Sequence, residues 1–264
     1  MCLRKSLDYK TIKIIAILLA VLFLLGWLGY WLGIGRSTDS GGQKLSYENK
    51  VITEEFNEPA YQIKVDYPFF TGPADNLNHL NDLIYQTVTK QVSNFKNELS
   101  DWPSSESSQD FYASSLNTDY DLIQADTVLV SLRFNMSSYL AGAAHPSSFS
   151  ETFNYSVRDG SLINLSDLFE PAADYLTVLS AYAIDDLASQ PDLKNGDGLA
   201  LSLIEQGAAV NKDNFSKFTI KPQGLEFYFD PYQVAPYAAG LRVVVIPWVY
   251  LKDIISADFN YLWD

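Results

Sequence analysis

Two tyrosines in residues 230–240 are the side chains of this sequence best suited to bind a ligand. Tyr232 follows Pro231, and Tyr237 follows Pro236. A tyrosine held by a proline is rigid and amphipathic, so it stacks on sugar rings or fills a cleft of a partner protein. Prolines fix φ near about −65° and lack an amide donor, which excludes a continuous central strand. We therefore expect an ordered loop with one tyrosine in the core and Tyr232 exposed as the contact; the alternative is a tyrosine-rich turn that only completes the core.

A second segment with chemical potential, residues 139–146, connects the predicted strands 127–134 and 149–157. It begins at Tyr139, continues through glycine and alanines, and ends with His145 and a proline. Such small residues predict a close-packed, bent connection. For His145 we favour a buried, hydrogen-bonded structural role over a ligand contact. Because both segments are rich in small residues, we expect 139–146 and the two-tyrosine loop to share one surface.

Familiar catalytic patterns are absent from the sequence. The two histidines, His79 and His145, stand outside any metal-type cluster, and no HExxH, GxSxG, P-loop or GxGxxG motif is present. With 32 acidic residues, carboxylate pairs arise by chance, so they do not support glycoside hydrolysis without a measured separation. We predict no cofactor, no metal and no enzymatic activity; the alternative at this point is an enzyme of unspecified chemistry.

The charge of the chain is unevenly distributed. Residues 1–36 contain five basic residues and one acidic residue, which leaves 13 basic and 31 acidic residues, a formal charge of −18, on the remainder. An acidic surface repels phosphate backbones, so nucleic acid is excluded as a partner. It attracts a cationic partner or serves only solubility. Cys2 is the only cysteine, so an intramolecular disulfide is impossible.

Residues 12–34 are an apolar run in which Lys13, near its start, is the only charge. As a helix the run is long enough to cross a membrane, and a cleavage site of the signal-peptide kind is not evident. More basic residues precede the run than follow it, which predicts a cytosolic amino terminus and an extracytoplasmic carboxy-terminal domain of a single-pass membrane protein. Gly29 and Gly33 form a small-xxx-small pair that permits a weak homodimer.

The hydrophobic periodicity of the remaining chain predicts an α+β fold with antiparallel sheets and packed helices. Asp159 and Gly160 predict a hairpin, and Ser166 is expected to cap a short turn. The remaining predicted elements are strands at 61–67 and 241–247, helices at 77–99, 176–187 and 199–209, a loop at 100–117 and a hairpin at 218–229. The predicted organisation is a cytosolic tail (1–11), a transmembrane signal anchor (12–34), a linker (35–49), a first α+β part of the ectodomain (50–140), a second part (141–255) and a C-terminal tail (256–264).

Three stretches resemble a paired extracytoplasmic module. Residues 61–99 together with the Tyr-Leu-Ala-Gly-Ala-Ala-His sequence at 139–145 resemble its first part, in which Ala141 replaces a usual glycine. The Asp-Gly at 159–160 with Leu-x-Asp-Leu-Phe, and then Tyr-Gln-Val-Ala-Pro-Tyr-Ala-Ala-Gly at 232–240, resemble its second part. The module occurs in the lysozyme-sensing anti-sigma factor RsiV and beside the catalytic domain of some peptidoglycan deacetylases.

This resemblance implies an α+β ectodomain that binds a lysozyme-like protein or peptidoglycan. Only about a dozen residues precede the apolar run, and no deacetylase domain follows, so we do not extend the anti-sigma or deacetylase function to this chain. Our leading hypothesis is a membrane-anchored binding or sensing module in the cell envelope. An enzyme that modifies cell-wall glycan, an accessory domain of such an enzyme, and a structural envelope protein remain the alternatives.

Overall fold

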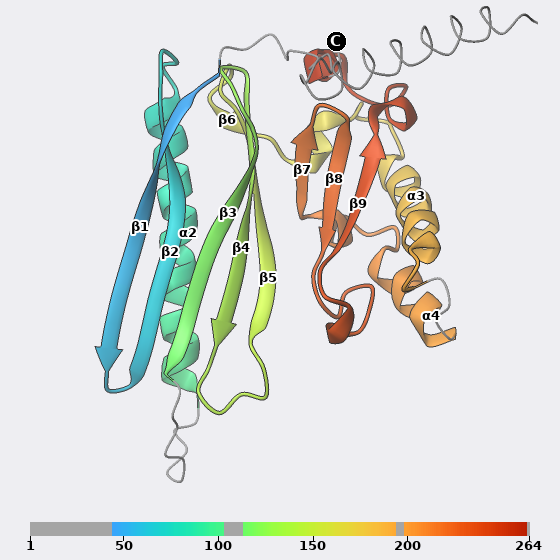
Figure 1. Cartoon of the computed structure of the whole chain (residues 1–264). Coiled ribbons are helices and arrows are strands. Elements are labelled where there is room, and N and C mark those ends of the chain that lie inside the picture. The colour runs from blue at the N-terminus through green and yellow to red at the C-terminus, as the bar shows by residue number, and fades with distance from the viewer. Residues whose placement is uncertain (1–43, 103–112, 194–197, 263–264) are drawn as a thin grey trace, which may run out of the picture. The chain divides into compact units, whose positions relative to one another are not determined.

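The computed structural model describes residues 44–102, 113–193 and 198–262. They form a six-stranded sheet in the order β1-β2-β3-β4-β5-β6 and a three-stranded sheet in the order β7-β8-β9. Helix α2 packs on the first sheet, and helices α3 and α4 lie beside the second (Figure 1). The mixture of sheets and helices confirms the predicted α+β class.

The first sheet begins with a long hairpin of β1 (Ser46–Asn57) and β2 (Ala60–Thr71). Strand β1 therefore starts inside the segment 35–49, whose last residues were wrongly predicted as linker. Most positions of β1 are exposed, because it is an edge strand with one neighbour. An exposed edge strand carries little apolar alternation, which is the main strand signal in a sequence.

One strand pairing differs from the expected antiparallel arrangement: β2 pairs in parallel with β3 (Ser114–Ala125). Helix α2 (Leu77–Asp101) runs between these two strands in the chain. Parallel neighbours need such a crossover because a tight turn can join only antiparallel strands. The predicted helix is confirmed and extends to Asp101, so the predicted loop at 100–117 is wrong at residues 100–101 and again from residue 114 onward.

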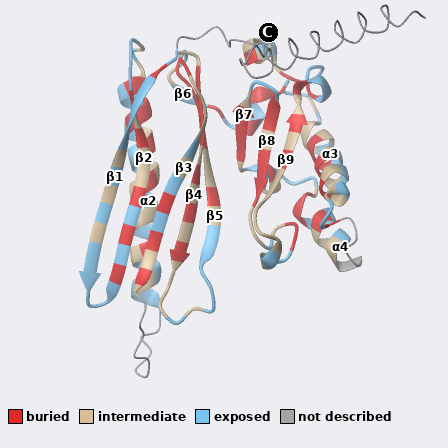
Figure 2. Ribbon diagram, in the orientation of Figure 1, coloured by how far each residue is buried: buried red, intermediate tan, exposed pale blue. Residues whose placement is uncertain are grey.

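The core of the first sheet lies on one face only. Helix α2 buries a stripe of apolar side chains against alternate residues of the strands, including β4 (Leu129–Tyr139) and β5 (Ser147–Ser156) (Figure 2). Side chains of a strand point alternately to opposite faces, so the intervening residues of β2 to β5 lie on the other face. The helical stripe consists of Leu77, Leu80, Ile84, Val88 and Phe95.

The sheet continues beyond residue 140, our predicted boundary between the two parts of the ectodomain. Strand β5 pairs with β4, and β6 (Ser161–Leu162) closes the predicted hairpin through Gly160, whose φ is +71°. The 3-10 helix η1 (Leu165–Leu168) follows. Its cap is Asn164, in a reciprocal capping box with Asp167, and not Ser166 as predicted. A cap must precede the first helical residue, and Ser166 is already the second residue of this helix.

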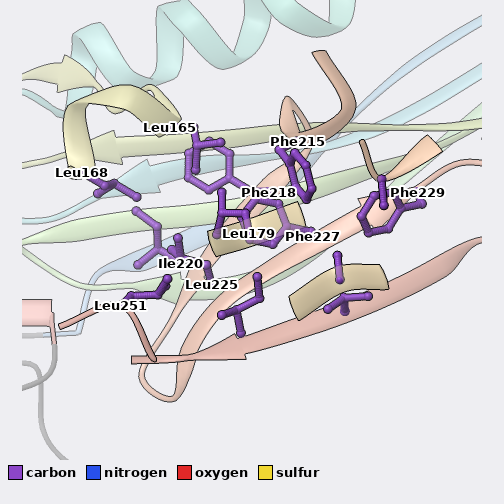
Figure 3. Close-up of a cluster of buried hydrophobic side chains, with 14 of the residues drawn as sticks. Leu165, Leu168, Leu179, Phe215, Phe218, Ile220, Leu225, Phe227, Phe229 and Leu251 are labelled. Carbon is purple, nitrogen blue, oxygen red and sulfur yellow. The ribbon is translucent and has the colours of Figure 1, made fainter. Parts of the chain in front are cut away.

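The second sheet has its own hydrophobic core, in which side chains of its strands meet α3 and several short helical turns (Figure 3). Its predicted hairpin and last strand are confirmed, as are both helices. The 3-10 helix η5 contributes Leu262 to this core, although we predicted a tail from residue 256. The elements are α3 (Tyr175–Ser189), α4 (Gly198–Gly207), η2 (Lys212–Phe215), β7 (Phe218–Lys221), β8 (Gly224–Phe229), β9 (Arg242–Pro247), η4 (Trp248–Tyr250) and η5 (Ala257–Leu262).

A polar junction joins β7 to the face of the first sheet that α2 leaves free. The buried hydroxyl of Ser131 accepts a hydrogen bond from the amide of Ile220 (2.9 Å) and donates one to Asn154 (2.7 Å). The side-chain amide of Asn154 in turn donates to the carbonyl of Phe218 (2.8 Å). Buried polar groups are costly unless paired, so these bonds fix how β7 lies against the sheet.

The predicted tail 1–11 and anchor 12–34 lie outside the described residues. Within the part of the chain that is described, no helix is both long and apolar enough to cross a membrane.

Candidate ligand-binding site

The segment after β8 is an ordered loop, as the prolines predicted. The amide of Tyr232 donates to the carbonyl of Ala235 (3.1 Å), and Tyr232 adopts a φ of +73°. The side-chain amide of Gln233 donates to the carbonyls of Gly207 and Asn214, both at 3.1 Å. Val234 and Ala235 are buried. These contacts hold the loop against the end of α4 and leave its tyrosines free to face outward.

Both tyrosines lie at the surface, contrary to the expectation that one belongs to the core. Tyr232 is 61% exposed and Tyr237, in the 3-10 helix η3 (Tyr237–Ala239), is half-buried. Their ring centroids are 5.5 Å apart. Val234 and Ala235 are the loop residues that enter the core, so the tyrosine rings are not needed to complete it.

The two predicted segments do share one surface. The ring of Tyr237 stacks on His145 with centroids 4.1 Å apart and planes at 25°, and its hydroxyl donates to the carbonyl of Pro146 (2.9 Å). His145 is exposed, so its interpretation as a buried structural histidine is wrong. The residues around it are exposed as well, because the connection bulges from the sheet instead of packing on it. Tyr139 is the last residue of β4, pairs with Ser115 and is half-buried.

An open groove of about 580 Å³ runs between this loop and the polar face of the first sheet. Tyr237 and Pro231 line one side of it, whereas Tyr232, Pro236, His145 and Tyr139 do not line it directly. The other side is formed by β2 to β5. The polar strand residues that line it are Lys64, Asp66, Asn117, Thr118, Asp119, Asn135, Ser137, Ser148 and Ser150.

The strand register arranges the floor of the groove in rows. Asn117 lies opposite Ser137, which lies opposite Ser148. In the next row Asp119 lies opposite Asn135, and the side-chain amide of Asn135 donates to that carboxylate (2.7 Å). Neighbouring strands are about 4.8 Å apart, so each row offers evenly spaced hydroxyl, amide and carboxylate groups.

Asp230 holds the loop to the edge of this floor. One carboxylate oxygen accepts a hydrogen bond from the amide of Ser150 (3.0 Å), and the other forms an ion pair with Lys217. On the far side of the groove, Asp66 pairs with Lys64 at 3.3 Å. The carboxylates are therefore fixed in position and still have free lone pairs for a ligand.

Arg133 forms an ion pair and a ring contact on the same face of the sheet, just beyond the groove. Asp121 pairs with Arg133 (2.7 Å), whose guanidinium lies over the ring of Tyr228 at 4.6 Å. Burial raises the pKa of Asp121, but the hydrogen bonds from Arg133 and Asn135 outweigh it and hold that pKa below its usual range. Burial and a hydrogen bond to Glu226 raise the pKa of the Tyr228 hydroxyl, which therefore stays protonated.

The sequence indicated the aromatic side of the groove but not its polar floor. Of the missed residues, only Lys64, Asp66 and Ser150 lie in predicted strands, where they alternate with apolar residues; the others lie in β3 or at strand ends that the sequence did not predict. Across the described residues, no group of three or more histidine, cysteine, aspartate or glutamate side chains is arranged to hold a metal ion. The groove offers many hydrogen-bonding groups together with the ring of Tyr237, a combination that is typical of ligand-binding sites.

Comparison with known proteins finds a family match for each part of the chain. Residues 54–148 match the family model described as deacetylase PdaC, and residues 166–249 match that of a protein of unknown function, DUF3298. The peptidoglycan-N-acetylmuramic acid deacetylase PdaC of Bacillus subtilis is 29% identical over 255 residues, 95% of this chain. The chain spans about half the length of that curated relative, 52% of it.

Solved structures share the fold at low sequence identity. A DUF3298 family member from Bacteroides fragilis has a TM-score of 0.59 and 16% identity, covering 83% of this chain and 97% of its own. A DUF3298 family protein from Pseudomonas aeruginosa has a TM-score of 0.55 and 14% identity, with the same coverage of both chains. The two family matches follow one another in one chain, which confirms the resemblance seen in the sequence: this protein carries the paired PdaC-type and DUF3298 module.

Proposed function

We propose that this chain is a membrane-anchored extracytoplasmic module that binds the glycan of peptidoglycan in the groove between the 230–240 loop and the polar face of the first sheet. The observation that carries the proposal is that Tyr237 lines one side of the groove, while rows of amide, hydroxyl and carboxylate groups line the other. A sugar ring has an apolar face that stacks on an aromatic ring, and an edge of hydroxyl groups that both donate and accept hydrogen bonds.

The dimensions of the groove agree with this ligand. At about 580 Å³ it is within the range of small-molecule sites, roughly 300–1,000 Å³. The likeness to a relative named as a peptidoglycan deacetylase supports a cell-wall ligand. We propose binding without turnover for this chain, with residues 12–34 as the anchor that places the groove at the cell wall and Gly29 and Gly33 as a weak dimer contact.

A direct test is sedimentation of the full chain with purified peptidoglycan sacculi, with the soluble products analysed by mass spectrometry. We expect the protein to sediment with the sacculi and to release no deacetylated or cleaved fragments. A protein that stays in the supernatant contradicts glycan binding. Fragments that accumulate with time contradict binding without turnover.

The acidic composition favours a second candidate, capture of a cationic lysozyme-like protein. The formal charge of −14 would accelerate association with a cationic partner, and salt would slow it because the Debye length falls to about 8–10 Å at physiological ionic strength. Surface plasmon resonance of lysozyme over the full chain tests this candidate. An association rate that does not change between low and high salt leaves the acidity with its solubility role alone.

A further inference from the structure

A second cavity of about 630 Å³ shares no lining residue with the groove. One wall comes from α2, including Thr87 and Lys90, and another from residues 151–154 of β5. Segments 162–166 and 212–216 close it, and the rings of Phe153, Tyr175 and Phe218 add apolar surface. A cavity with this mixture of apolar and polar walls suits a ligand that is itself mixed, such as a peptide.

The β5 wall exposes unpaired backbone at one residue. The amide of Ser150 bonds to Asp230 and the carbonyl of Asn154 accepts from the amide of Ile163 (2.9 Å), so both groups point away from β4. Backbone direction repeats every two residues in a strand, so the amide and carbonyl of Thr152 point the same way. Among the described residues, neither of these Thr152 groups has a backbone partner outside the sheet. An open pair of this kind is able to exchange hydrogen bonds with the backbone of an extended peptide.

Two lysines that line the cavity form no ion pair among the described residues, although the charge of Lys90 interacts with that of Glu151. Eight lysine and arginine side chains of the described residues form ion pairs, but Lys90 and Lys212 are not among them. Both line this cavity. Glu151 and Asp213 line it too, so its walls carry both signs of charge. Mixed charges disfavour a polyanion and suit a peptide with a single carboxylate.

We propose that this cavity is a second binding site, which takes a short extended peptide carrying a carboxylate group. The central residue of the peptide exchanges two hydrogen bonds with the backbone of Thr152, as an added strand does. Its carboxylate lies between Lys90 and Lys212. The proposal does not depend on glycan binding, because the two sites have separate walls.

Isothermal titration of the full chain with acetyl-Ala-Glu-Ala-amide tests the proposal. We expect binding that weakens about tenfold when glutamine replaces the glutamate of the peptide, the size of a hydrogen bond to a charged group. Methylation of the amide nitrogen of the same peptide residue should also weaken binding about tenfold, because it blocks strand pairing at Thr152. Absence of binding by the acidic peptide, or equal binding of the glutamine peptide, overturns the proposal.

Protein variants locate the site. Lys90→Gln and Lys212→Gln should each weaken the acidic peptide several-fold while leaving thermal unfolding unchanged, because both side chains are exposed. Lys252→Gln is the matched control: it removes the same charge from an exposed lysine that also lacks an ion pair among the described residues and does not line the cavity. A loss as large in Lys252→Gln as in the cavity variants would mean general charge attraction and contradict the assignment.

Discussion

Tyr237 is the side chain on which the glycan groove depends most. It lines the groove, stacks on His145 and hydrogen-bonds to the carbonyl of Pro146, so it also ties the 230–240 loop to the β4–β5 connection. A ring held by two contacts loses little freedom when a sugar stacks on it, which favours binding. Tyr232 stands beside it and extends the aromatic surface.

Replacing Tyr237 by alanine should therefore weaken binding of soluble peptidoglycan fragments by about 2 kcal/mol or more, the scale of an aromatic hot spot. Tyr237→Phe keeps the ring and loses one hydrogen bond, so it should cost only about 1 kcal/mol. Fluorescence titration measures both. Tyr250→Ala removes an exposed tyrosine that does not line the groove, and is the control. Equal affinity of Tyr237→Ala and Tyr250→Ala would show that the ring is not a contact.

The loop that presents Tyr237 is positioned by the end of α4. A Cβ atom on Gly207 would lie 1.9 Å from the carbonyl oxygen of Gln233, a distance that no side chain tolerates. The same loop residue donates its side-chain amide back to the carbonyl of Gly207. Close approach of helix and loop therefore requires glycine at this position.

Gly207→Ala should push the loop away from α4. We expect a loss of about 1–3 kcal/mol in the free energy of unfolding, as for other overpacked sites, together with weaker glycan binding. Urea denaturation and fragment titration measure the two effects. A variant with the unfolding free energy of the parent would mean that the loop yields without cost and does not depend on this contact.

Individual helices and loops were easier to predict from the sequence than the way in which the elements pack against one another. The apolar stripe of α2 and the prolines of the 230–240 loop fix local structure through periodicity and φ, so both were found from sequence. The parallel pairing of β2 with β3 was not found, because no local pattern reports which strand lies beside which. His145 was misplaced for the same reason: its burial depends on how far the connection extends from the sheet. The polar floor needed the strand register, which brings Asn117, Ser137 and Ser148 together.

The free energy of unfolding of the whole molecule should fall at low pH, because some of its carboxylates are paired in the folded state. Hydrogen bonds from Arg133 and Asn135 hold the pKa of Asp121 below its usual value despite burial, which opposes them. A hydrogen bond from Arg242 lowers the pKa of Asp192 in the same way. A carboxyl with a lowered pKa in the folded state stabilises the fold above its unfolded pKa, roughly 3.9, and this contribution is lost as pH falls toward the folded value.

Urea denaturation between pH 7 and pH 2 should therefore show little change from this source above about pH 5 and a falling free energy of unfolding below about pH 4. Asp121→Asn removes one of the responsible groups, so its stability should fall less steeply with acid than that of the parent. Parallel pH profiles for parent and variant would exclude a contribution from the pair with Arg133.

The central claim is that the groove binds the glycan of peptidoglycan. Ser137→Leu tests it most directly, because it places an apolar side chain on the polar floor of the groove and touches neither core. Calorimetric titration of the full chain with purified glycan fragments should give binding that weakens at least about tenfold in Ser137→Leu, since buried ligand hydroxyls lose their partners. The matched change Ser202→Leu, on the exposed surface of α4, should leave affinity unchanged. Undiminished binding by Ser137→Leu, or no binding by the parent, would contradict the claim.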